Sequence, residues 1–101
     1  MFTQREASRA EVILAVEGPL SGETTGEFQN RMEKLTEGQY VTITLDLSQT
    51  PSINSSALGK ILLFRKKMAE HGRTLQIVGC SDSLFRTFQM ISFDKLVTIK
   101  K

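Results

Sequence analysis

The chain has 101 residues, which is enough for one compact domain and little else. Apolar residues make up 40% of it and charged residues 24%, as in ordinary soluble globular proteins. The 13 basic and 11 acidic residues nearly cancel, and no concentrated basic stripe is present, so we expect no direct binding to nucleic acid.

Cysteine and histidine are too few for a metal centre. Cys80 is the one cysteine and His71 the one histidine, so neither an intrachain disulfide nor a metal cluster is indicated, and we expect no cofactor. No apolar run approaches the roughly 20 residues that would span a bilayer. The first residues also lack the apolar stretch of a secretory signal. These features predict a single cytoplasmic domain over residues 1–101 with no membrane contact.

The first third of the chain predicts strands followed by a helix. Residues 12–16 form a short apolar run that ends at Gly18 and Pro19, which is typical of a buried strand leading into a turn. A weaker edge strand is expected near residues 2–5. From about residue 22 to residue 35 apolar side chains recur at helical spacing, with Ser21 as the expected N-cap. These apolar side chains are Phe28, Met32 and Leu35.

The middle of the chain predicts a strand and a long helix. Residues 41–47 alternate apolar and β-branched side chains, which indicates a strand. A helical pattern then runs from Ser55 or Ser56 to His71, with Phe64 at the border of its apolar arc and Arg65 inside the arc, its stem packed and its head in water. The expected buried arc consists of Ala57, Leu58, Ile61, Leu62, Met68 and Ala69.

The last part of the chain predicts a strand over residues 75–78, a short helix capped by Ser81 or Asp82, and a final strand over residues 96–99. The short helix should bury Leu84, Phe85, Phe88 and Ile91. Alternation of strands and helices in this order predicts an α/β fold, with a mixed sheet of four to five strands packed against three to four helices.

No catalytic motif accompanies this fold. The sequence holds no nucleotide phosphate loop, no dinucleotide fingerprint, no HExxH and no CxxC. His71 is expected to serve as a favourable charge at a helix C-terminus, and Cys80 as a small structural residue. The carboxylates form no pair that their spacing alone would place together. We therefore expect a binding protein and not an enzyme.

The unusual segment is residues 46–59, in which a strand ends and Asn54, Ser55 and Ser56 open a helix. Each of these three residue types caps helices well, so one interpretation is that they only satisfy the free backbone N–H groups of the first turn. One helix start does not need three such side chains, however. One hydroxyl should therefore face solvent.

The pattern resembles STAS domains of anti-sigma factor antagonists. In that family Asp-Leu-Ser and a variable loop precede an Asp/Asn-Ser-Ser/Thr-Gly/Ala-Leu-Gly block, which stands here as Asp46-Leu47-Ser48 and Asn54-Ser55-Ser56-Ala57-Leu58-Gly59. The likeness extends over most of the chain, including an early Gly-Pro-Leu-Ser turn and a later Gly-Arg-Thr-Leu strand entry. Gly is frequent at the exit of the late helix in the family, where this chain has Ser92 and Phe93.

The resemblance implies a phosphorylation switch. In the family the second residue of the Ser-Ser/Thr pair accepts a phosphate, which points to Ser56, with Ser55 as the fallback. The partners implied are an anti-sigma factor with serine kinase activity and a serine phosphatase of the metal-dependent class. Asn54 and Ser21 stand where the family usually has Asp, so this chain lacks two negative charges on the docking face.

The partner-binding face should surround that hydroxyl. Leu63 lies far from the apolar arc of its helix and is a candidate contact, since Gly59 leaves a shallow gap beside it. The candidate partner-binding residues are Ser21, Asn54, Ser55, Ser56, Gly59, Lys60 and Leu63. Two alternatives remain at this point: a STAS phospho-switch that controls biofilm, motility or secretion through a non-sigma partner, and a small-molecule or nucleotide binder that uses a crevice at the strand ends.

Overall fold

The computed structural model describes all residues from Met1 to Lys101. Five strands form one mixed sheet in the order β1-β2-β3-β4-β5, in which β1 is antiparallel to β2 and every other neighbouring pair is parallel. The elements are β1 (Phe2–Glu6), β2 (Glu11–Glu17), α1 (Glu23–Glu37), β3 (Thr42–Gln49), α2 (Ser55–Glu70), β4 (Thr74–Val78), α3 (Asp82–Met90), the 3-10 helix η1 (Phe93–Lys95) and β5 (Thr98–Ile99). The predicted α/β architecture is confirmed.

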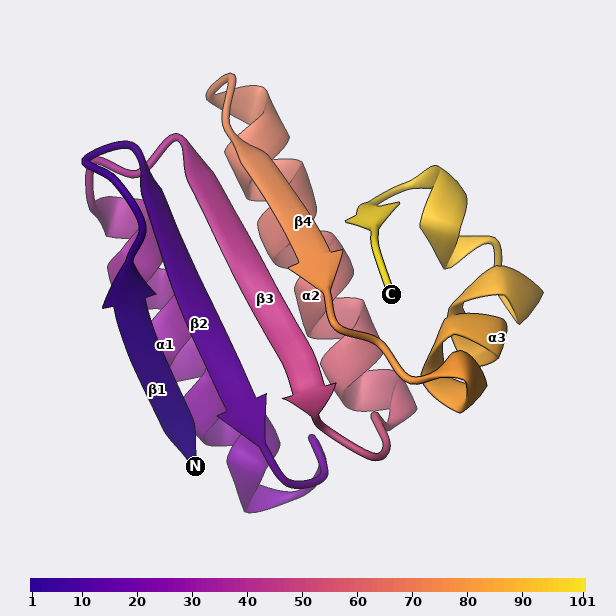
Figure 1. The fold of residues 1–101 in the computed structure, drawn as a ribbon. Coiled ribbons are helices and arrows are strands. Elements are labelled where there is room, and N and C mark those ends of the chain that lie inside the picture. The colour runs from indigo at the N-terminus through magenta and orange to yellow at the C-terminus, as the bar shows by residue number, and fades with distance from the viewer.

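The two long helices lie together against the sheet. In Figure 1 α1 and α2 lie behind β1 to β4, while α3 and η1 lie beside β4. Alternate residues of β2 are fully buried, and the strand register aligns Leu14 with Leu45 and Leu45 with Ile77. This period of two is what a strand needs to turn one face toward a core. None of the helices is long and apolar enough to cross a membrane.

Helix α1 buries the predicted side chains, but its N-cap differs from the prediction. Phe28 and Met32 are fully buried and Leu35 is nearly so. The N-cap position is held by Gly22, at φ 58°, and no side chain caps the helix. Ser21 therefore lies one residue before the cap, and its prediction as the N-cap was wrong. The left-handed backbone of Gly22 is the cause, because it turns the chain into the helix one residue later than expected.

Helix α2 is rotated slightly from the predicted arc. Ala57, Ile61 and Met68 are buried as expected, while Phe64 is 1% exposed and lies inside the core instead of at its border. The Phe64 ring meets the ring of Phe28 edge to face, with centroids 6.4 Å apart. This aromatic contact places Phe64 at the centre of the buried stripe. Leu58 and Leu62 are consequently half-buried, and Ala69, which we expected to be buried, is exposed.

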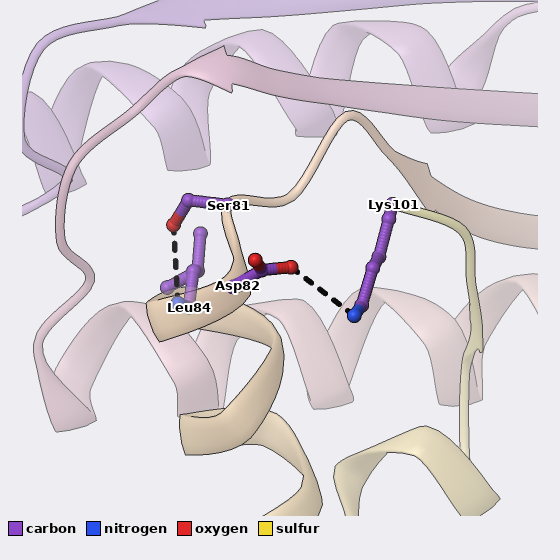
Figure 2. Close-up of polar contacts among 4 residues, drawn as sticks. All are labelled: Ser81, Asp82, Leu84 and Lys101. Carbon is purple, nitrogen blue, oxygen red and sulfur yellow. Dashed lines mark hydrogen bonds and ion pairs between the residues drawn. The ribbon is translucent and has the colours of Figure 1, made fainter.

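The last strand is shorter than predicted, because β5 spans only Thr98–Ile99 and the 3-10 helix η1 precedes it. Helix α3 is capped by Ser81, whose Oγ accepts a hydrogen bond from the backbone N–H of Leu84 at 3.1 Å (Figure 2). Figure 2 also shows the ion pair between Lys101 Nζ and Asp82 Oδ1, at 3.1 Å. Leu84 and Phe88 are buried and Phe85 is half-buried, but Ile91 is 51% exposed. Its prediction as a core residue was wrong because α3 ends at Met90 and Ile91 is already the C-cap.

Candidate functional site

Two loops meet at the carboxyl ends of β2 and β3, next to the start of α2. Residues 18–22 and residues 50–54 are joined by backbone hydrogen bonds, from Leu20 N–H to the Ser52 carbonyl at 2.9 Å and from Asn54 N–H to the Leu20 carbonyl at 3.2 Å. The buried Thr50 hydroxyl adds a bond to the Val16 carbonyl at 2.7 Å. The fully buried Leu20 anchors this junction. The structure thus brings the loop that carries Ser21 beside the beginning of α2.

A single side chain caps α2. Asn54 has an extended backbone, and its Oδ1 accepts a hydrogen bond from the Ala57 N–H at 2.8 Å. Ser55 and Ser56 are the first two residues of the helix, both are exposed, and neither hydroxyl bonds to another protein group. Since Asn54 caps the helix and neither serine hydroxyl is engaged, both hydroxyls are available to a partner molecule.

Ser56 heads a row of residues along the exposed side of α2. Gly59, Lys60 and Leu63 follow Ser56 at i+3, i+4 and i+7, the spacing that keeps side chains on one face of a helix. We call Ser56, Gly59, Lys60 and Leu63 the Ser56 stripe. Leu63 is 49% exposed, and a Cβ atom at Gly59 would meet nothing within 4 Å. The stripe therefore presents a hydroxyl, a bare backbone gap, a cation and an apolar side chain in line.

Lys60 links the stripe to α1. Its Nζ donates a hydrogen bond to Gln29 Oε1, and Gln29 Nε2 in turn donates to Glu33 Oε1 at 3.1 Å. Lys60 is half-buried, and its direct acceptor is a neutral amide oxygen. The sequence did not indicate this contact, because Gln29 and Lys60 are 31 residues apart.

The Asp-Leu-Ser segment shapes the end of β3. Asp46 Oδ1 accepts a hydrogen bond from the Ser48 N–H at 3.0 Å. The side chain of the intervening residue, Leu47, is buried in the core. Gly79, at φ 76°, packs so closely that a Cβ there would lie 2.9 Å from Asp46 Oδ1 and 3.0 Å from Ser48 Cβ. Gly79 was missed as a supporting residue. Its only signal was its position directly after a strand.

Cys80 and His71 lie outside the stripe. Cys80 is buried, and burial raises the pKa of its thiol to about 11, so it is almost entirely protonated near neutral pH. This agrees with its prediction as a structural residue. His71 is the C-cap of α2, at the opposite end of the helix from Ser56, and its Nδ1 lies 3.0 Å from the Lys67 carbonyl oxygen.

The mixed sheet with two long helices against it, and the free hydroxyls at the start of α2, fit the STAS-type domain that the sequence resembles. The model of the STAS domain family matches residues 3–101, and the chain belongs to that family. No curated protein sequence is similar enough to count as a match.

Solved structures with this fold include anti-sigma factor antagonists and a transporter domain. A Thermotoga maritima protein described as a candidate anti-sigma factor antagonist is 25% identical, with a TM-score of 0.89, over 99% of this chain and 86% of that one. The unphosphorylated anti-sigma factor antagonist SpoIIAA, of Bacillus, is 16% identical, with a TM-score of 0.75, over 89% of this chain and 83% of that one. The STAS domain of a SulP transporter from Vibrio cholerae is also 16% identical, with a TM-score of 0.73, over 93% and 75% of the two chains. The last two likenesses concern the fold alone.

Proposed function

We propose that this STAS domain is an anti-sigma factor antagonist that is switched by phosphorylation of Ser56, with Ser55 as the second choice. The observation that carries the proposal is the position of the Ser56 hydroxyl, which is exposed, unbonded and at the start of α2 while Asn54 caps the helix. The likeness to the Thermotoga maritima protein supports the same class of function.

The chemistry is a phosphoryl transfer to Ser56 Oγ. A kinase moves the terminal phosphoryl group of ATP onto the oxygen, the hydroxyl loses its proton, and ADP leaves; a phosphatase restores the hydroxyl by hydrolysis and releases inorganic phosphate. The domain supplies only the acceptor and is not an enzyme. The phosphate adds about −1.5 to −2 charges at neutral pH, and a helix N-terminus favours negative charge, so the domain stays folded.

The partner responds to that charge. A partner surface that is complementary to a neutral hydroxyl, to Gly59 and to Leu63 offers no cation of its own, so burying the phosphate against it would cost several kcal/mol. Each 1.4 kcal/mol corresponds to about tenfold in affinity, so phosphorylation should weaken binding by at least about a hundredfold. The unmodified domain binds the partner, and the phosphorylated domain releases it.

The partner in this proposal is an anti-sigma factor that is also a serine kinase with a histidine-kinase-like ATPase fold. Its capture by the unmodified domain frees a sigma factor for transcription. A serine phosphatase of the metal-dependent class resets the switch, and the exchange takes place in the cytoplasm. The face in contact with the partner is the Ser56 stripe with Ser21, Asn54 and Ser55 beside it.

Affinity capture from the native cell tests this function. Wild type, Ser56→Ala, Ser56→Asp and Ser83→Asp serve as baits, and mass spectrometry quantifies the captured anti-sigma factor. Ser83 is the matched control because it is also the second residue of a capped helix and is also exposed. We expect Ser56→Asp alone to lose the anti-sigma factor, and phosphopeptide analysis to find phosphate on Ser56. Equal capture by all four baits would refute the switch.

A second candidate keeps the switch and changes the partner. Ser21 and Asn54 are neutral where the family usually has Asp, so the face around Ser56 offers a different charge to a partner. This favours a partner outside sigma-factor control, in a biofilm, motility or secretion pathway. The same capture experiment separates the two candidates, because only the first yields an anti-sigma factor that Ser56→Asp releases.

A further inference from the structure

Lys60 is the one basic residue near Ser56 along the segments that build the site. Neither loop of the junction, residues 18–22 or residues 50–54, contains Lys or Arg, and the next basic residue of α2 is Arg65. Arg65 lies nine residues after Ser56, roughly 14 Å along the helix axis, whereas Lys60 is one turn away at roughly 6 Å. Within α2 and these two loops, Lys60 is therefore the cation closest to a phosphate on Ser56.

The geometry of a helix favours that pairing. Side chains of an α-helix tilt toward its N-terminus, so the Lys60 stem leans toward the turn that carries Ser56. Residues at i and i+4 have Cβ atoms about 6 Å apart, and Gly59 has no side chain that would stand between them. The flexible Lys stem and its three N–H donors allow a change of acceptor without a change of backbone.

The present acceptor of Lys60 is weaker than a phosphate. Gln29 Oε1 is a neutral amide oxygen, while phosphate oxygens are charged, so a phosphate adds to the hydrogen bond a charge–charge attraction that the amide lacks. The one ion pair of the structure joins Lys101 and Asp82, so no carboxylate holds Lys60 directly. Lys60 would therefore gain charge attraction, and would give up no ion pair, when it exchanges Gln29 for a phosphate.

We propose that Lys60 is an internal switch residue, which bonds to Gln29 of α1 when Ser56 is unmodified and moves to the phosphate when Ser56 is phosphorylated. This inference rests on the proposed function. It adds two consequences: the phosphorylated domain is stabilised by its own counter-ion, and the modification at α2 is transmitted to Gln29 and Glu33 on α1.

A thermodynamic cycle on the full chain tests the switch. Phosphoserine is installed at position 56 during translation in wild type, Lys60→Gln and Lys66→Gln, and urea unfolding is measured with and without the phosphate. Lys66 is exposed on the same helix but about 15 Å from Ser56 along the axis, which makes it the matched control. We expect the phosphate to lower the unfolding equilibrium constant about fivefold more in wild type and Lys66→Gln than in Lys60→Gln. The difference should shrink as salt rises.

A second measurement distinguishes exchange from simple charge attraction. The side-chain amide of Gln29, followed by NMR, should shift on phosphorylation of wild type, and should show no such shift in Lys60→Gln, where its partner is already absent. An equal effect of the phosphate on the stability of all three proteins, or an unmoved Gln29 amide in wild type, would overturn the inference. No kinase or partner enters these measurements, so their failure is separate from failure of the capture experiment.

Discussion

Gly59 lies in the proposed binding face, where an added methyl group should raise the stability of the domain and lower its affinity for the partner. Gly59→Ala adds that methyl, and Gly26→Ala is the matched control on α1. Both glycines are exposed, are the fourth (Gly26) and fifth (Gly59) residues of a long helix, and leave a Cβ free of contacts within 4 Å. Alanine is favoured over glycine in a helix interior by about 1 kcal/mol, so each variant should gain about 0.5–1 kcal/mol. For a domain of this size the melting temperature should rise by about 4 °C.

Binding should separate the two variants. In the Ser56 stripe the gap at Gly59 lies between Ser56 and Leu63, and a partner that packs into the gap would clash with a methyl group at a cost of about 1–3 kcal/mol. Affinity for the captured anti-sigma factor should therefore fall by about tenfold in Gly59→Ala and remain unchanged in Gly26→Ala.

Urea unfolding and titration calorimetry with the purified partner check these two expectations. A Gly59→Ala protein that is more stable and binds as tightly as wild type would show that the gap is not part of the contact surface. A Gly59→Ala protein that is less stable than wild type would contradict the open helical environment of Gly59 itself.

Two further predictions concern the supports of the site. Gly79→Ala should destabilise the domain by at least about 2 kcal/mol in urea unfolding, because the added methyl would meet Asp46 and Ser48 and the backbone there is left-handed. Gly72→Ala is the control, because Gly72 has φ 69° and no close neighbour. It should show only the backbone cost of about 1 kcal/mol. Equal losses in the two variants would contradict the close packing at Asp46. The Cys80 thiol, followed by its ultraviolet thiolate absorbance against a Cys80→Ala blank, should titrate near pH 11, since burial raises its pKa above the ordinary value of 9.0. Because the folded state holds this proton more tightly than the unfolded state, wild type should lose stability relative to Cys80→Ala as pH rises from 9 to 11, and a midpoint near 9 would refute the burial effect.

Segments with a clear apolar pattern predicted well which of their side chains are buried. The apolar run over residues 12–16 predicted a buried strand, and the spacing of Phe28, Met32 and Leu35 predicted the buried face of α1, because each pattern depends on one element packing against one core. The boundaries were less well predicted. Ser21 and Ile91 were each misplaced where one residue decides whether the helix has begun or ended.

Contacts between distant segments were beyond such patterns. The place of Phe64 in the core depends on its edge-to-face contact with Phe28 on another helix, and the role of Gly79 depends on the turn made by Asp46 and Ser48. A helical wheel shows which side of one helix is apolar, but it does not show which residues of other elements contact that side. The same limit applies to Lys60. The sequence predicted it on the partner-binding face but did not predict its hydrogen bond to Gln29 on α1.

In the proposed switch, the charges around Ser56 favour the phosphate. With Ser21 and Asn54 neutral and Lys60 one turn away, the surroundings of Ser56 repel a phosphate less than two aspartates would. The modified state of the isolated domain is therefore stable, and the energy that separates binding from release must come from the partner's surface. It follows that substitutions at Lys60 should change the stability of the phosphorylated domain, whereas substitutions at Gly59 or Leu63 should change the affinity of the unmodified one.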